Sequence, residues 1–311
     1  MSQVINSRWD TTSNRDFYKA GILSKIFDDT DTAAFVFYPK LVQEINSADE
    51  WIRHGKVAGL LPAGELAEGQ NIPIQSVPSP LTKTFTLKRW GTGFRMTDWA
   101  NRFNKFQQYE RLTRSLKKIQ KVTKDIEVHR MFNNPTSSTY AGTGFDGQVL
   151  AYATHTGLLS GSTTDNYDNI LSVTPSYVAL ASVRYYYKTA KDDMGQYLGM
   201  EPGTLVYEPT LWPTWKEILG SDLLAFEMSN TKSPWKGWLE TVEDPRITST
   251  TAWFVIAKKE TENYGLYVFN NKEPDFVVKD APDNTRDRVV TSEQIFTYGF
   301  DQPRAYLQGN T

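Results

Sequence analysis

The chain has 311 residues, which is long enough to bury the core of one large domain or of two moderate ones. Its 34 basic and 36 acidic side chains leave a formal net charge of −2, so no overall field indicates a nucleic-acid or membrane partner. Cysteine is absent, which excludes disulfide bonds, thiolate zinc sites and a cysteine nucleophile.

Apolar runs and aromatic content indicate where the chain resides and what it contacts. The N-terminus lacks the basic start and apolar run of a signal peptide, and no apolar run is long enough to span a membrane. Nine Trp, 16 Tyr and 16 Phe are present, and such residues dominate both cores and protein–protein contacts. We therefore expect a chain that is soluble and intracellular when made, with no membrane partner.

Residues 1–50 are interpreted as an arm. A short amphipathic helix is predicted over Arg15–Phe27, and a short strand over Ala33–Tyr38 that Pro39 ends. The segment holds too little apolar surface to fold alone. It must therefore lie against another part of the chain or another copy.

Residues 51–97 are interpreted as an extended hairpin. Leu61–Gly69 is turn-rich and acidic, whereas Leu81–Trp90 alternates apolar residues with threonines, as in a strand with one solvated face. Hairpin arms of ten residues would reach about 33 Å, well beyond their own core. A hairpin of this length is expected to contact a partner.

A long helix is predicted over residues 98–132. Asp98 is a good N-cap, and neither Gly nor Pro occurs before Pro135. At the rise of an α-helix this element would be roughly 50 Å long. Its apolar residues recur at steps of three or four: Trp99, Phe103, Phe106, Tyr109, Leu112, Leu116, Ile119, Val122 and Ile126.

The remainder of the chain mixes helices and strands, which predicts an α+β fold without internal repeats. Thr174 and Pro175 indicate a helix that begins there and continues to about Lys191. A second helix is predicted over Pro213–Leu219, ending at Gly220. The predicted strands are Thr204–Pro209, Trp253–Ala257, Gly265–Phe269 and Arg288–Phe300.

No set of residues in the sequence indicates catalysis, a metal ion or a cofactor. The chain has three histidines, and none has the spacing of a zinc enzyme. Residues 142–147 are glycine-rich but lack the Lys-Ser/Thr pair of a phosphate loop, so a connector is the better interpretation. Asp28–Asp31 lacks the glycine and distal glutamate of a calcium loop and is interpreted as a solvated turn. We expect a protein that is not an enzyme.

Charge is concentrated on the predicted long helix. Residues 101–130 contain nine basic and three acidic side chains, a net charge of +6, which leaves −8 for the rest. The basic face is either a solvated helix surface or a surface that faces a polyanion such as DNA without reading its sequence. The candidate DNA-facing residues are Arg111, Arg114, Lys117, Lys118, Lys121 and Lys124.

Several segments resemble the major head proteins of tailed bacteriophages, in the Mu-like major head subunit group of the HK97-type capsid fold. Ala67–Pro73 with Thr82–Trp90 resembles the family's E-loop, and residues 98–134 resemble its spine helix. Further similar segments follow in family order: Phe145–His155, Leu205–Pro209 with Glu217–Ser221, Trp253–Ala257 and Asp301–Tyr306.

The resemblance implies a domain order and a function. It implies an N-terminal arm (1–50), an E-loop hairpin region (51–97), a P-domain with the spine helix (98–149), an A-domain (150–265), and P-domain return strands with a C-terminal segment (266–311). The E-loop would lie over a neighbouring subunit, with contact residues Leu61, Glu65, Glu68, Phe85 and Leu87.

The partners that the resemblance implies are mainly other copies of the chain. These would form pentamers and hexamers of an icosahedral shell around double-stranded DNA, together with a separate scaffold protein, a portal and possibly decoration proteins. The protein would belong to the virion capsid and assemble in the cytoplasm of the bacterial host.

Three alternatives stay open at the level of sequence. An encapsulin-like compartment shell shares the fold, but the basic helix favours DNA as the content. An aromatic-rich carbohydrate-binding or adhesin module would have many short strands and no long helix. A hydrolase would need a nucleophile and base near His155, which no motif supports.

Overall fold

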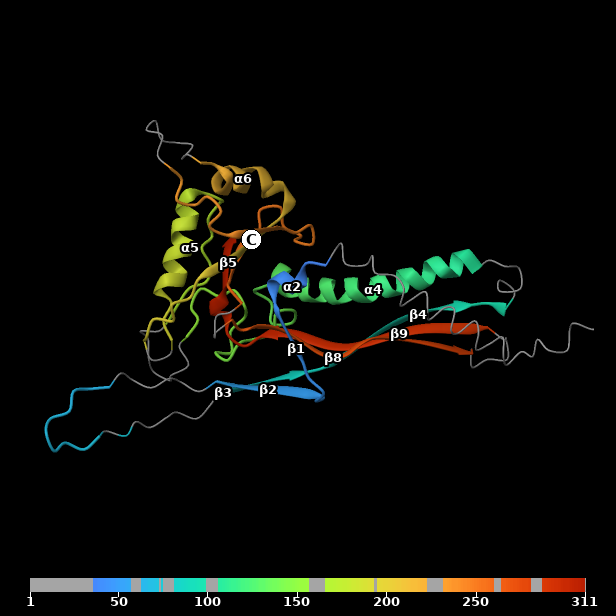
Figure 1. Ribbon diagram of the computed structural model, residues 1–311, viewed down its shortest axis with the longest axis horizontal. Coiled ribbons are helices and arrows are strands. Elements are labelled where there is room, and N and C mark those ends of the chain that lie inside the picture. The colour runs from blue at the N-terminus through green and yellow to red at the C-terminus, as the bar shows by residue number, and fades with distance from the viewer. Residues whose placement is uncertain are drawn as a thin grey trace, which may run out of the picture.

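The computed structural model describes residues 36–56, 63–72, 74, 81–98, 106–156, 166–192, 195–222, 232–259, 264–280 and 287–310. The predicted helix Arg15–Phe27 and the turn Asp28–Asp31 lie outside these residues. Figure 1 shows an elongated part, in which helix α4 runs along long strands, and an upper part that contains α5 and α6. The α+β prediction is confirmed.

The elongated part is built on a four-stranded sheet with the order β1-β8-β9-β4. Strand β9 (Arg288–Phe300) has the predicted bounds, whereas β8 (Leu266–Asp280) extends eleven residues beyond the prediction. The residues just after Phe269 are polar and pair with β9 through two register shifts. They therefore lack the regular alternation by which a strand is recognised in a sequence. Strand β4 (Lys88–Met96) lies antiparallel to β9, and the short β1 (Gln43–Asn46) lies parallel to β8.

Helix α4 (Phe106–Asn133) covers one face of this sheet, which confirms the long helix. Its 28 residues correspond to a length of about 42 Å. Leu116 packs against Met96, Phe276 and Val290 of the sheet. The proposed N-cap role of Asp98 is not tested, because residues 99–105 lie outside the described part.

The predicted apolar stripe of α4 is only partly the buried face. Leu112, Ile119 and Ile126, which recur at the predicted helical spacing, are 41–45% exposed. Gln120 is buried instead: its Nε2 donates to Ser292 O at 3.0 Å, and Gln294 Nε2 donates to its carbonyl at 2.9 Å. The sheet offers polar partners to the helix, so the side-chain amide of Gln120 is buried with its Nε2 hydrogen-bonded.

The upper part contains a second four-stranded sheet, with the order β10-β7-β5-β6. Strand β5 (Pro202–Tyr207), η3 (Pro209–Leu211) and α6 (Trp212–Gly220) agree with the predicted strand and helix, and β7 (Trp253–Ala257) has the predicted bounds. Helix α5 (Tyr177–Thr189) begins later than predicted, because the Ser176 hydroxyl accepts from Ala179 N and caps it in place of Thr174.

The end of the chain lies in this second sheet. After η4 (Pro303–Ala305), β10 (Tyr306–Asn310) pairs antiparallel with β7, and β6 (Glu240–Glu243) forms the other edge. Residues 266–311, predicted as return strands with a C-terminal segment, thus divide between the sheets, with β8 and β9 in the first and β10 in the second. The fully buried side chains of Trp215, Trp253 and Tyr187 fill the core between this sheet and its helices.

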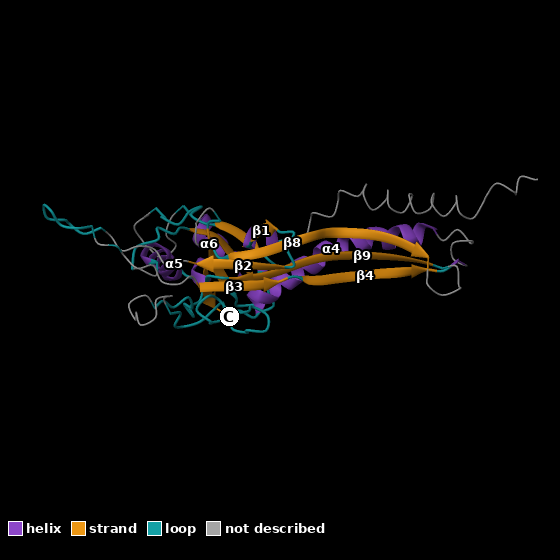
Figure 2. Cartoon of the chain, turned by 90° about the horizontal axis from the view of Figure 1, so that it is seen from below, coloured by secondary structure: helices purple, strands orange, loops and turns teal. Residues whose placement is uncertain are grey.

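The hairpin is shorter than its predicted region. Strands β2 (Trp51–Lys56) and β3 (Leu81–Thr86) form a separate antiparallel pair, with Lys56 opposite Leu81 at the end nearest the tip. Figure 2 shows β3 leading into β4, with β2 beside β3. Because β4 pairs with β9 instead, the predicted strand Leu81–Trp90 breaks at Leu87, and residues 88–97 do not belong to the hairpin.

The described end of the arm is helical. The predicted strand over Ala33–Tyr38 is wrong in its described part, because Tyr38–Leu41 forms the single turn α2. Pro39 is compatible with a first helical turn, where its missing amide would have no partner. Among the described residues, no helix is both long and apolar enough to cross a membrane.

Candidate assembly surfaces and the junction between them

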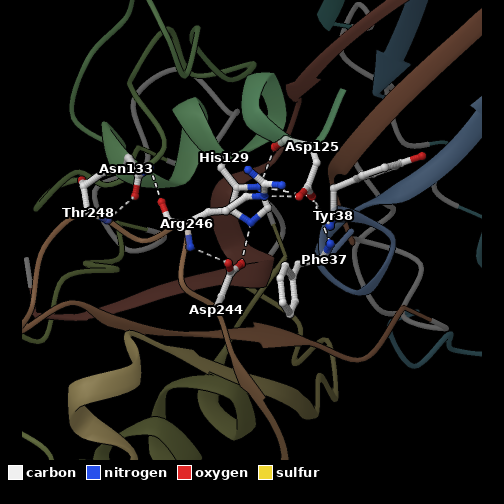
Figure 3. Close-up of polar contacts among 8 residues, drawn as sticks. All are labelled: Phe37, Tyr38, Asp125, His129, Asn133, Asp244, Arg246 and Thr248. Atoms are coloured by element: carbon white, nitrogen blue, oxygen red, sulfur yellow. Dashed lines mark hydrogen bonds and ion pairs between the residues drawn. The ribbon is translucent and has the colours of Figure 1, made fainter. Parts of the chain in front are cut away.

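A buried polar junction joins the arm, α4 and the segment after β6 (Figure 3). At its centre, the carboxylate of Asp125 on α4 is fully buried. Its Oδ1 accepts from the backbone amides of Phe37 and Tyr38 at 3.0 and 2.9 Å, and its Oδ2 forms an ion pair with Arg246. One side chain therefore holds the start of α2 and the segment after β6 against α4.

His129 extends this junction by one helical turn. Its Nδ1 lies 2.5 Å from Asp125 O and its Nε2 lies 2.5 Å from Asp244 Oδ2. Asn133, a further turn along, donates to Arg246 O at 2.9 Å. The junction thus follows one face of α4 over successive turns, as residues four apart on a helix do.

The geometry favours a protonated His129. Both ring nitrogens face oxygen acceptors, so each must carry a proton to form its hydrogen bond. Burial opposes the charge, but the hydrogen bond to Asp244 and the nearby Asp125 carboxylate outweigh it, so the pKa of His129 is raised. With His129 charged, the carboxylates of Asp125 and Asp244 face the cations of His129 and Arg246, and the cluster has no net charge.

Stability should therefore depend on pH through His129. A histidine whose folded pKa is raised stabilises the fold fully below its ordinary value of 6.5, and this contribution is lost as pH rises through the folded pKa. We expect the free energy of unfolding to fall as the pH rises above 6.5. Urea unfolding at a series of pH values measures it.

A His129→Gln variant is the control for this pH dependence. It should be less stable at low pH and should lack the decline. Lys83 acts in the opposite direction at higher pH: burial lowers its pKa to about 8, so stability should rise between that value and its ordinary 10.5. An equal decline in wild type and His129→Gln would show that His129 is not the responsible group.

The base of the hairpin is fixed to its own chain. Phe85 is 5% exposed and packs on Phe269 at a ring distance of 4.8 Å. His54 Nδ1 lies 3.1 Å from Asp301 Oδ2. The ammonium of Lys83 donates to the carbonyls of Thr143 and Phe300, the latter at 2.7 Å. Phe85 is therefore a core residue, and its prediction as an intersubunit contact was wrong.

The described tip of the hairpin is open to solvent. Glu65 and Glu68 are exposed, as predicted for contact residues, and Leu66, Ile72 and Ile74 are 42%, 77% and 97% exposed. Apolar side chains of this exposure on a projecting hairpin are typical of a contact with a partner. Of the other candidates, Leu87 is half-buried and Leu61 lies outside the described residues.

The basic residues of α4 divide into separate groups. Lys118 and Lys121 are exposed and Lys117 is half-buried. Lys124 is only 6% exposed, lies 3.9 Å from Glu273 and lies over the rings of Tyr38 and Phe296. Its prediction as a DNA-facing residue was wrong, because its position on the helix faces the sheet. The side chains of Arg111 and Arg114 lie outside the described part.

The third histidine, His155, is a structural residue. Its ring is fully buried, lies 2.6 Å from Asp146 Oδ2 and stacks on Tyr167 at 5.0 Å. Within the part of the chain that the structure describes, no His, Asp and Glu side chains form a group that could hold a metal ion.

A family model described as phage capsid protein matches residues 80–308, which include α4, strands β4, β8 and β9 of the first sheet, and the second sheet up to the middle of β10. The chain belongs to the phage capsid protein family. It is a major capsid protein, a shell-forming subunit of the virion capsid, with the HK97-type fold. No curated protein sequence matches it.

Solved capsid structures have the same fold at low sequence identity. The capsid protein of cyanophage P-SCSP1u is 9% identical, with a TM-score of 0.59 over 89% of both chains. The mature capsid of bacteriophage PhiM1 is 12% identical, with a TM-score of 0.58 over 91% of this chain and 89% of that chain. A virus-like particle from Pyrococcus furiosus is 9% identical, with a TM-score of 0.51 over 94% of this chain and 99% of that chain. The encapsulin-like alternative is not better supported than a phage capsid.

Proposed function

We propose that copies of this capsid protein form the pentamers and hexamers of an icosahedral head around double-stranded DNA. The head would assemble in the host cytoplasm with a scaffold protein and a portal. Decoration proteins are further possible partners. Support for shell formation comes from the capsid family match over residues 80–308.

The proposed domains follow the family order, with two boundaries moved. The P-domain would comprise α4 and the first sheet, including β4, and the A-domain would comprise the second sheet, including β10. The hairpin tip would lie over a neighbouring subunit. This arrangement is supported by a hairpin whose base is held by its own chain while its tip exposes apolar side chains.

The inner surface is proposed to include the exposed lysines of α4. Support comes from the net charge of +6 over residues 101–130 and from the exposure of Lys118 and Lys121. Lysines of this kind neutralise phosphates without reading sequence, and their contribution falls as salt rises.

Reversing these two charges tests the proposal. In Lys118→Glu/Lys121→Glu, particles made with the phage's packaging proteins should retain roughly half the DNA, or release it at lower salt, because phosphate contacts are lost. The DNA content of purified particles, measured by absorbance and gel electrophoresis, gives the result.

Lys272→Glu/Lys279→Glu is the matched control. Both residues are exposed on β8, and they line a hollow with Arg89 and Glu293 on the sheet. The charge change is the same, but the α4 surface is unaffected, so DNA content should stay normal. Normal DNA content in the α4 variant would remove the support for a DNA-facing helix.

A further inference from the structure

A groove rich in tyrosine lies along α5. Its volume is about 720 Å³, and its lining includes Val178, Tyr185, Tyr186 and Tyr197. We call these four residues the tyrosine groove. Tyr185 is 71% exposed, Tyr197 68% and Val178 74%. Exposed tyrosines around a hollow are the side chains that most often anchor protein–protein contacts.

The floor of the groove is held in place before any partner binds. The hydroxyl of Tyr186 donates to Arg304 O at 3.3 Å. Arg304 is 4% exposed, and its guanidinium lies 5.0 Å from the centre of the Tyr167 ring. A preformed floor lowers the entropic cost of ordering the site on binding.

The groove lies at one edge of the second sheet. The segment that lines it follows β10: Leu171 N donates to Gln308 O at 2.8 Å, and Ile170 forms a bridge to Gln308. Strand β10 is the first strand in the order β10-β7-β5-β6, so β6 is at the opposite edge. A surface on the β6 side of one copy could face the groove of the next copy.

An exposed aromatic side chain follows β5, the strand that pairs with β6. Trp212, the first residue of α6, is 46% exposed and is followed by Pro213. The turn before it is fixed, since Thr210 N donates to Glu208 Oε2 at 2.8 Å and Thr210 Oγ1 donates to Thr250 O at 3.1 Å. A large apolar side chain on a rigid turn is suited to enter a hollow.

Some charges of the two surfaces are complementary. Arg184 and Lys191 of the α5 segment are basic, and Glu243 on the β6 strand is exposed. Lys188 and Glu240 also lie on these surfaces, but each forms an ion pair within its own chain. Opposite charges around an aromatic contact favour the correct partner and oppose pairing of two like surfaces.

We propose that the tyrosine groove of one copy receives Trp212 of a second copy, with the β6 strand of that copy facing the basic side of α5. A contact between two different patches on opposite edges of the subunit is head-to-tail. Such a contact closes into a ring when the rotation from one copy to the next divides a full turn evenly. The proposal rests on the shell-subunit function and gives it a specific contact.

Cross-linking tests this contact, because the chain has no cysteine. Tyr197→Cys and Trp212→Cys are combined in one chain and treated with a short bismaleimide after assembly. A head-to-tail contact should give a ladder of covalent oligomers up to the capsomer size on a denaturing gel. Tyr140→Cys/Trp212→Cys is the matched control, since Tyr140 is 43% exposed and lies outside the groove. It should give no ladder.

The possible outcomes separate this contact from shell formation. Shells that form normally but give no ladder with Tyr197→Cys/Trp212→Cys overturn the contact and leave the capsid function intact. Absence of any particle from the wild-type chain overturns the shell function, and this proposal with it. An equal ladder in the control also overturns the contact, because it shows collision-driven cross-linking.

An alanine variant gives a second readout that does not depend on cross-linker geometry. Tyr185→Ala/Tyr197→Ala should raise the subunit concentration needed for assembly roughly tenfold or more, because exposed aromatic anchors carry much of a contact's affinity. Its thermal unfolding should match wild type, since both side chains are mostly exposed. Unchanged assembly in a correctly folded variant contradicts the proposal.

Discussion

Asp125→Ala is expected to lower the free energy of unfolding by about 3–5 kcal/mol, the usual cost of removing one partner from a buried ion pair. The variant would remove the ion pair between Asp125 and Arg246 and the acceptor of the Phe37 and Tyr38 amides. It would also leave His129 beside a cluster whose charges no longer cancel. Urea unfolding of the purified chain measures the change.

Asp222→Ala is the control for this loss. Asp222 has an exposed side chain that, among the described residues, pairs with the exposed Lys236, so its removal should change stability by no more than about 0.5 kcal/mol. The stability loss of Asp125→Asn should lie between those of Asp125→Ala and Asp222→Ala. The amide oxygen of Asn can still accept from the amides at the start of α2, but it cannot balance the charge of Arg246. Equal stability of Asp125→Ala and wild type would contradict the role of the junction.

Removing the hairpin tip is expected to abolish shell assembly without unfolding the chain. Residues 57–80 would be replaced by Asn-Gly, which closes a two-residue hairpin turn between Lys56 and Leu81. The contacts of Phe85 and Lys83 at the base remain, so the melting temperature should change little. Loss of the exposed tip removes the proposed contact with the neighbouring subunit. Sedimentation velocity measures assembly, and circular dichroism measures folding.

A point variant separates contact from hairpin length. Ile72→Ser/Ile74→Ser keeps the tip at full length and changes its two most exposed apolar side chains. It should assemble less well than wild type and better than the truncated chain. Normal shells from the truncated chain would show that the tip does not hold neighbouring subunits together.

The elements with local signals were predictable from sequence. Strand β9 and helix α6 were placed within one or two residues, because alternation and an ending glycine are short-range signals. Strand β8 was underestimated, since its second half is polar and bulged. The short α2 was misread as a strand because Phe37 and Tyr38 favour strands, while the actual pairing of their amides is with distant Asp125.

The polar junction could not be predicted, because its partners are far apart in sequence. Asp244 lies 115 residues after His129, and no spacing rule connects them. The only local signal was Asp125 and His129 at positions four apart on a predicted helix. Lys124 was misplaced for a related reason: a helical wheel identifies faces, but only the sheet decides which face is buried.

Electron microscopy of the purified full-length chain, expressed alone and together with its neighbouring genes, tests the central claim most directly. We expect closed polyhedral shells, or rings of capsomer size, because the chain belongs to the phage capsid family. A monomer under every condition, with no particle or ring in the micrographs, would contradict the assignment of this chain as a shell-forming subunit.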